Sequence, residues 1–390
     1  MTAPIEEVGT VCYIGAGTMG CVNSLVAAVS GYDVVLYDLS EETLSMVAER
    51  QRGFAEHMVA IGYCTAEAVP DALARVRTTS DPADAAAGAD LVSESVVEQV
   101  GIKRDAHALF DRLCGPSTIL TTNTSSLLVS EIEGAVERGG RFAALHSHLG
   151  SPLYDIVGGP RTTPETIDVL RRFVLSLGGV PLVLRREYRG YVVNGLIGAL
   201  TRTALQLIAR GDATVPLVDR SWMLHRSAPI GPFGLLDLFG LDVVADNMRN
   251  ATDSADQAAR RSSVLPLLTD MVEAGNLGMK TGSGFYEYPD TAYGRPDFLE
   301  DQTGTEAMHR LLVGAVIHRA VVIAADGVAE PEDVDRAWQA AMGLDSGPFD
   351  VVRELGPDEF GEMSRELVAS DLISETEAHR AQDYVNRLPR

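Results

Sequence analysis

A glycine-rich turn near the N-terminus constrains the fold of this chain more than any other feature. Val11–Ile14 is a short apolar run typical of a buried strand, and Gly15-Ala16-Gly17-Thr18-Met19-Gly20 follows it at once. A stretch of small and apolar residues with helical periodicity then continues to about Ser30. Three glycines at this spacing, between a strand and a helix, predict a unit in which the helix packs closely on a sheet.

Strand and helix patterns alternate over the rest of the first half. Helical patterns lie, for example, at Glu41–Ile61 and Thr163–Ser176. The alternation indicates a mainly parallel, doubly wound α/β sheet of the Rossmann type. After about Arg186 the strand patterns fade, and Asn194–Arg210 has the periodicity of a helix. Besides Val11–Ile14, the predicted strands are Asp33–Tyr37, Asp90–Ser93, Thr118–Thr121, Phe142–Leu145, Leu153–Val157 and Val180–Leu184.

The second half contains an internal repeat whose offset of 116 residues equals the separation of Trp222 and Trp338. Asp219-Arg220-Ser221-Trp222 recurs as Asp335-Arg336-Ala337-Trp338, and Gly231-Pro232-Phe233 recurs as Gly347-Pro348-Phe349. Because both tryptophans of the chain fall in register, we predict two related all-α domains. The expected domains are an α/β domain at 1–186, a first helical copy at 187–290 and a second at 300–390.

The three glycines have the roles of a dinucleotide-binding turn. Gly15 allows a tight turn, Gly17 lets the backbone approach a pyrophosphate, and Gly20 lets the helix pack against the strand. The alternative is a glycine-rich turn that binds nothing.

The residues around the turn favour NAD. The helix N-terminus at Thr18 and Met19 offers amide N–H groups to phosphates. Asp38 ends the second strand, where a carboxylate can accept hydrogen bonds from ribose hydroxyls and would repel a 2′-phosphate. Leu39 and Ser40 supply no compensating cation, so we expect NAD rather than NADP, with FAD as the minor alternative.

Composition narrows the classes of partner. The formal net charge of −23 argues against nucleic acid and anionic membranes. No apolar run approaches the roughly 18 residues of a membrane helix, and the N-terminus lacks the pattern of a signal peptide. The four cysteines form no C-x-x-C pair, which indicates reduced thiols. We therefore expect a cytoplasmic protein.

Several separate motifs, in the same order, resemble those of the 3-hydroxyacyl-CoA dehydrogenase family. The resemblance covers nearly the whole chain and implies NAD-dependent oxidation of a secondary alcohol, in the setting of fatty acid metabolism. It also implies cofactor contacts for Glu98, Lys103 and Asn123. The matching segments are Leu91–Lys103, Thr122–Leu127, His146, Gly190–Asn194, Gly231–Asp237 and Gly278–Tyr286.

His146 is the predicted acid/base. It follows the strand Phe142–Leu145, at the carboxyl end where open α/β sheets bind ligands. Histidine suits proton transfer because its unperturbed pKa is about 6.5. The hydroxyl of Ser125 and the amide of Asn194 are the expected contacts to the substrate oxygen. His148, two residues further on, is a rival base.

The residues after His146 depart from the family pattern. The family places Asn and Pro third and fourth after the histidine, where this chain has Leu149 and Gly150, and its orienting Glu falls on Gly158. If the loop is three residues shorter, Asp155 becomes the carboxylate partner that fixes the His146 tautomer. The alternative is a solvated Asp155 and a broken dyad.

The expected reaction interconverts a 3-hydroxyacyl thioester and its 3-oxoacyl form. The acyl group would be carried by CoA or by an acyl carrier protein, and basic residues in Glu41–Thr79, read as helical, could meet CoA phosphates. The alternatives are a dehydrogenase of a free 3-hydroxy acid and a catalytically decayed NAD-binding protein. We expect no metal, one active site because Arg310 replaces Asn194 in the second copy, and a monomer or homodimer.

Overall fold

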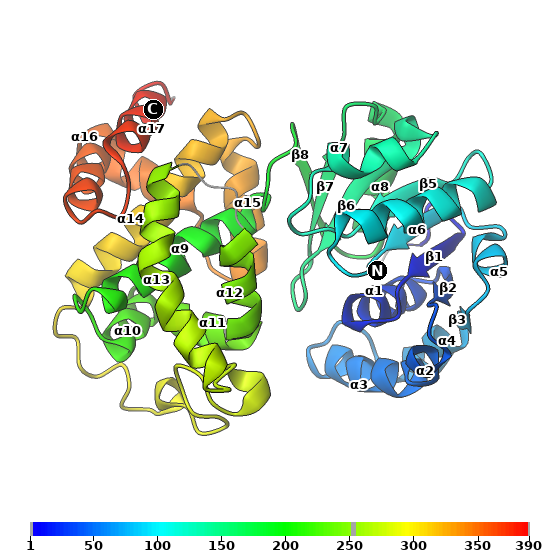
Figure 1. The fold of residues 1–390 in the computed structure, drawn as a ribbon, viewed down its shortest axis with the longest axis horizontal. Helices are drawn as coiled ribbons and strands as arrows, with labels where there is room; N and C mark the ends of the chain where they lie inside the picture. The colour runs from blue at the N-terminus through cyan, green and yellow to red at the C-terminus, as the bar shows by residue number, and fades with distance from the viewer. Residues whose placement is uncertain (1–2, 251–254, 389–390) are drawn as a thin grey trace. The chain divides into compact units, whose positions relative to one another are not determined.

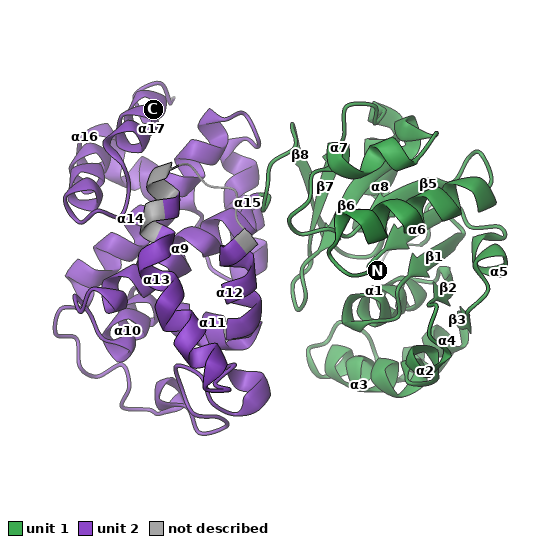
Figure 2. Cartoon of the chain, viewed as in Figure 1, with its two compact units in different colours: residues 1–191 green, residues 192–390 purple. Residues whose placement is uncertain are grey.

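The structure is a computed structural model that describes residues 3–250 and 255–388. The chain divides into two compact units, Met1–Tyr191 and Val192–Arg390 (Figure 2). The first unit is an α/β domain and the second is helical (Figure 1). The predicted fold class is therefore confirmed. The finer limits of two separate helical domains stay a prediction, since both repeats lie in one compact unit.

The first unit is built on an eight-stranded sheet with the order β3-β2-β1-β4-β5-β6-β7-β8. Neighbouring strands are parallel except β6 and β7, which run antiparallel. In this antiparallel pair, the carboxyl end of β6 lies beside the amino end of β7. The strands are β1 (Thr10–Ile14), β2 (Asp33–Tyr37), β3 (Val76–Thr79), β4 (Leu91–Glu94), β5 (Ile119–Thr122), β6 (Phe142–Ser147), β7 (Leu153–Gly158) and β8 (Val180–Leu184).

Strand β3 corrects the prediction of helix as far as Thr79. It is a four-residue edge strand, so its pattern of one Val, one Arg and two Thr carries little apolar signal. Arg75 lies next to it and pairs with Asp33 at 3.4 Å, while Arg77 pairs with Asp84 at 2.6 Å. Their guanidinium groups are therefore already paired with carboxylates.

Helices cover the sheet of the first unit and bury its apolar strands. Buried residues of the first helix, such as Leu25, pack in one core with Val11 and Leu36. Side-chain caps begin three of the helices, at Ser40, Asp81 and Thr163. The helices are α1 (Thr18–Val29), α2 (Glu41–Ser45), α3 (Val47–Ala60), α4 (Val69–Ala74), α5 (Pro82–Ala86), α6 (Val100–Leu113), α7 (Val129–Ile132) and α8 (Pro164–Ser176).

The repeat has a structural counterpart in the second unit. Asp219 Oδ1 accepts a hydrogen bond from Phe233 N at 2.8 Å, and Asp335 Oδ1 accepts one from Phe349 N at 2.6 Å. A Cβ at Gly231 or Gly347 would collide with the aspartate of the same copy. The two tryptophans meet edge to face, 6.4 Å apart. The helices are α9 (Val193–Ala209), α10 (Val215–Arg226), α11 (Pro232–Phe239), α12 (Leu241–Asn250), α13 (Ala255–Glu273), α14 (Thr305–Ala325), α15 (Pro331–Met342), α16 (Pro348–Ala369) and α17 (Glu375–Val385).

Helix α14 is long and apolar enough to cross a membrane, although no uninterrupted apolar run in the sequence predicts one. Its most apolar window is 72% buried inside the unit, where the helix packs against α9, α10 and α16. A helix that is buried on most sides is apolar all round. We therefore interpret α14 as the central core helix of the helical unit.

Candidate active site

The glycine-rich turn has the geometry that a dinucleotide needs. Gly15 has φ +95°, and a Cβ there would lie 2.8 Å from the Ser95 carbonyl oxygen. A Cβ at Gly20 would lie 1.8 Å from the Gly15 carbonyl oxygen, so this glycine sets the close packing of α1 on β1. At Gly17 a Cβ would meet nothing within 4 Å. The space in front of Gly17 is thus open for a phosphate to approach the backbone.

The start of α1 and the end of β2 complete the cofactor site. Gly17 and Thr18 are exposed and Met19 is partly exposed, and no side chain caps the helix N-terminus. Asp38 Oδ2 accepts a hydrogen bond from Ala16 N at 2.8 Å, and Oδ1 accepts one from Ser40 N at 2.9 Å. These bonds fix the carboxylate beside the turn. Free amides at the helix start and a fixed carboxylate fit the pyrophosphate and ribose of NAD.

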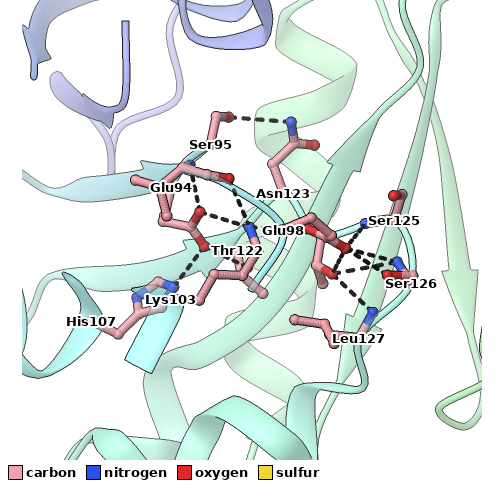
Figure 3. Close-up of polar contacts among 12 residues, drawn as sticks. Glu94, Ser95, Glu98, Lys103, His107, Thr122, Asn123, Ser125, Ser126 and Leu127 are labelled. Carbon is pink, nitrogen blue, oxygen red and sulfur yellow. Dashed lines mark hydrogen bonds and ion pairs between the residues drawn. The ribbon is translucent and has the colours of Figure 1, made fainter. Parts of the chain in front are cut away.

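A buried network of charged and polar side chains surrounds Glu94, the last residue of β4. Lys103 Nζ is 2.7 Å from Glu94 Oε1 and 3.2 Å from Glu98 Oε2 (Figure 3). His107 Nε2 and the Thr122 hydroxyl contact the other Glu94 oxygen at 3.2 and 2.7 Å. Burial acts to raise the pKa of Glu94, but the bonds from His107 and Lys103 outweigh it and lower that pKa to about 2. Lys103 is fully buried, and its ammonium group is the ion-pair partner of Glu98.

Glu98 organises the loop that follows β5. One carboxylate oxygen, Oε1, accepts bonds from the Thr124 hydroxyl and from the backbone N–H groups of Ser125 and Ser126, at 2.5, 3.0 and 3.0 Å (Figure 3). Burial acts to raise the pKa of Glu98, but the Lys103 charge and these bonds lower it. Ser125 itself is exposed, and its backbone rather than its hydroxyl is tied to Glu98. The hydroxyl therefore stands at a fixed point of the loop.

Asn123 links two strand ends. Its Nδ2 donates to the Ser95 hydroxyl at 3.2 Å, and its Oδ1 accepts from Ser147 N at 2.9 Å. The structure thus places Asn123 between Ser95, just after β4, and Ser147, the last residue of β6. Its predicted contact with the cofactor stays a prediction.

The antiparallel strands β6 and β7 bring His146 and Asp155 together. The two residues lie directly opposite each other in the register. His146 Nδ1 is 2.9 Å from Asp155 Oδ2, and the Asp155 side chain is completely buried. The bond selects the tautomer with a proton on Nδ1, which leaves a lone pair on Nε2. The shorter loop proposed from the sequence therefore brings this aspartate to the histidine.

Two further side chains complete the surroundings of His146. His148 Nε2 is 2.8 Å from the same Asp155 oxygen. The ring of Tyr191 lies 5.2 Å from the His146 ring, and its hydroxyl donates to the Thr124 carbonyl at 2.8 Å. Tyr191 has φ +49°, a conformation that sequence periodicity does not reveal. The sequence motif Gly190–Asn194 contains Tyr191 but predicts no role for it.

The electrostatics of the pair suit a base. Burial lowers the pKa of His146, and the bond to Asp155 only partly opposes this, so the net shift is downward. Burial acts to raise the pKa of Asp155, but the bonds from His146 and His148 lower it. Asp155 is thus ionised and His146 neutral near pH 7.

The same three side chains form a group of candidate metal ligands. Their separations of 2.8 and 2.9 Å match hydrogen bonds from imidazole N–H groups to a carboxylate. We therefore interpret the group as hydrogen-bonded, and the expectation of no metal stays a prediction. Asn194 belongs to the second unit, in the first turn of α9, and its role also stays a prediction.

Residues 10–188 match the model of the 3-hydroxyacyl-CoA dehydrogenase NAD-binding domain, and residues 190–288 and 308–388 match that of its C-terminal domain. The chain belongs to the 3-hydroxyacyl-CoA dehydrogenase family. The family model confirms NAD as the cofactor and the oxidoreductase class. Its C-terminal model matches both helical copies.

Three similar proteins show how far the likeness extends. Human mitochondrial hydroxyacyl-coenzyme A dehydrogenase is 34% identical over 295 residues, covering 71% of this chain and 90% of its own. A 5-formyl-3-hydroxy-2-methylpyridine 4-carboxylate 5-dehydrogenase from Mesorhizobium japonicum is 31% identical, with 71% and 90% covered. The structure of 3-hydroxybutyryl-CoA dehydrogenase from Escherichia coli covers 98% of this chain and 100% of its own, with a TM-score of 0.81 and 22% identity. The last comparison shows a shared fold.

Proposed function

We propose that this protein interconverts a 3-hydroxyacyl thioester and the 3-oxoacyl form, with His146 as the acid/base. The observation that carries the proposal is the bond between His146 Nδ1 and Asp155 Oδ2, which leaves Nε2 as the nitrogen that can take a proton. The human relative, named as a hydroxyacyl-coenzyme A dehydrogenase, supports the thioester substrate.

In the oxidative direction the substrate hydroxyl gives its proton to His146 Nε2. The turn Gly15–Gly20 and Asp38 would hold NAD, which would supply the acceptor for the hydride on the carbon that bears this hydroxyl. Asp155 stabilises the imidazolium that forms and holds the ring in place. In the reductive direction His146 starts protonated and returns the proton to the substrate oxygen.

The loop that follows β5 supplies a second contact to the substrate oxygen. Glu98 binds the backbone of Ser125, so the Ser125 hydroxyl is held by the loop rather than by its own side-chain bonds. Asn194 is proposed as another donor to that oxygen. Lys103 acts as a positioning residue because it neutralises Glu98 from a buried site.

The test is NADH oxidation with acetoacetyl-CoA by wild type and His146→Gln. General acid–base catalysis contributes about 10²- to 10⁴-fold, so we expect a loss of that size in kcat. His57→Gln is the matched control because His57 is exposed on α3. Full turnover by His146→Gln would show that the assignment is wrong.

A free hydroxy acid is the second candidate substrate. Leu149, at the position where the family places Asn, is 61% exposed at the tip of the short loop, so this chain lacks an amide there. The Mesorhizobium japonicum relative is named for a carboxylate that is not a thioester. Turnover of acetoacetate at a kcat/KM above that of acetoacetyl-CoA would favour the free acid.

The remaining partners and the location are predictions. Acetoacetyl groups on an acyl carrier protein, assayed beside acetoacetyl-CoA, would separate the two thioesters. Light scattering would separate a monomer from a homodimer. Location in the cytoplasm stays a prediction. The third alternative is a catalytically decayed NAD-binding protein, and NADH binding without any turnover would favour it.

A further inference from the structure

Two histidines share one carboxylate oxygen at the end of the β6–β7 pair. His148 Nε2 lies 2.8 Å and His146 Nδ1 lies 2.9 Å from Asp155 Oδ2. The second oxygen, Oδ1, is buried and has no hydrogen-bond partner among the residues that the structure describes. One oxygen of the buried carboxylate therefore accepts the hydrogen bonds of both imidazole rings.

The arrangement follows from the strand register. His146 lies opposite Asp155, and side chains two positions apart point to the same face of a strand. His148 is therefore a diagonal neighbour of Asp155, within reach of a long side chain. His148 N donates to the Leu153 carbonyl at 3.3 Å, and Ser151 N donates to the His148 carbonyl at 3.1 Å. Backbone pairing thus holds the second ring in position.

We propose that His148 is a positioning residue: its hydrogen bond to Asp155 Oδ2 weakens the hold of that carboxylate on a proton at His146. The inference rests on the proposed function, in which His146 is the base. A second hydrogen bond to the ionised carboxylate stabilises its negative charge, so the carboxylate holds a proton on His146 less strongly. His146 is then kept unprotonated, ready to take the substrate proton.

Groups on several elements act on the His146 ring. Burial lowers the pKa of His146 most strongly; the Asp155 bond raises it, the His148 charge lowers it, and the Glu98 charge raises it. The Tyr191 ring packs against His146 and is neutral, because burial raises the pKa of Tyr191 well above its ordinary value. Removing His148 should therefore raise the pKa of His146 and favour its protonated form.

The test is an NMR titration of the imidazole signals in the full-length protein, with the His146 signal assigned by its loss in His146→Gln. His148→Phe removes the donor. His148→Gln keeps a side-chain N–H donor. We expect the His146 midpoint to rise by roughly half to one pH unit in His148→Phe, and by less in His148→Gln.

Leu149→Ala is the control, because Leu149 is in the same connection and is exposed. Its His146 midpoint should equal that of wild type. An unchanged or lower midpoint in His148→Phe overturns the inference. If His148→Phe does not fold, His148→Leu, which also lacks the donor, takes its place, and a midpoint no higher than that of wild type overturns the inference.

The pH profile of kcat/KM for alcohol oxidation gives a second readout, since its acid limb should move with the NMR midpoint. A purely structural role for His148 would lower kcat without moving that limb. The two proposals fail separately. Turnover by His146→Gln refutes the proposed base but leaves the titration readable, whereas a static midpoint refutes the role of His148 alone.

Discussion

Asp155 lies directly across the β6–β7 pair from His146, and its Oδ2 is 2.9 Å from His146 Nδ1. The relationship depends on backbone hydrogen bonds between the two strands rather than on a flexible loop. Aspartate is one methylene shorter than glutamate, and the direct cross-strand position makes that reach sufficient. The geometry of the dyad is therefore fixed by the sheet.

Asp155→Asn should abolish most turnover while leaving the fold intact. An amide keeps the size of the side chain but loses the charge that stabilises the imidazolium, and its NH2 group can donate where the carboxylate only accepts, which favours the wrong tautomer. We expect kcat to fall about 10²- to 10⁴-fold, by analogy with other carboxylate–histidine pairs. NADH affinity, measured by fluorescence, should not change. Asp168→Asn, on the exposed face of α8, is the control.

Alcohol oxidation should be lost at acid pH. The base must be neutral, and burial lowers the pKa of His146 from its ordinary 6.5. The reaction should therefore be constant at neutral pH and fall as pH drops through a midpoint below 6.5, whereas reduction should need the protonated form. The measurement is kcat/KM against pH in both directions. An oxidative midpoint above pH 7 would contradict the assignment.

Gly17→Ala should weaken NADH binding without destabilising the fold. Its added methyl group meets no protein atom within 4 Å, so it would occupy the space where the backbone approaches the pyrophosphate. We expect a Kd for NADH raised at least about tenfold, which corresponds to about 1.4 kcal/mol. Gly101→Ala is the control, because Gly101 lies in α6 and also has open space.

The same substitution at Gly20 should act differently. Its methyl group would lie 1.8 Å from the Gly15 carbonyl oxygen, so backbone must shift. Gly20→Ala should lower both the Tm and NADH affinity, and a variant with normal thermal stability would show that this packing is not required.

The two lysines of the chain provide a matched pair. Lys103 is buried between Glu94 and Glu98, whereas Lys280 pairs with Asp242 at the surface. Removing one partner of a buried ion pair costs about 3–5 kcal/mol, and an exposed pair contributes about 0–1 kcal/mol. Urea unfolding should therefore show a large loss for Lys103→Met and a small one for Lys280→Met. Equal losses would contradict the buried network.

The sequence predicts the parallel part of the fold well, because buried strands and the glycine-rich turn have strong local signals. Strands β1 and β2 and the cofactor turn follow from these signals alone. The short edge strand β3 does not, since only Val76 in it is apolar. Neighbouring strands in a parallel sheet are brought together by long connections, which local patterns do not specify.

The candidate site divides in the same way. His146 and Asp155 are found from motif and spacing, but that His148 contacts the same carboxylate follows from the antiparallel register. The position of Tyr191 depends on a backbone conformation with positive φ, which no side-chain pattern announces. The buried network around Glu94 depends on α6 and β5 reaching the same point behind β4.

The hydrogen bond between an aspartate and a phenylalanine amide occurs in both helical copies, whereas the proposed substrate donor occurs in the first copy alone. Asp219 and Asp335 serve the folding of their own copies in the same way. The second copy has Arg310 in place of Asn194, and that arginine pairs with Glu359 and Glu366 at the surface. The second copy has therefore kept the folding contact of the first, while the position of its proposed substrate donor carries an arginine held in surface ion pairs.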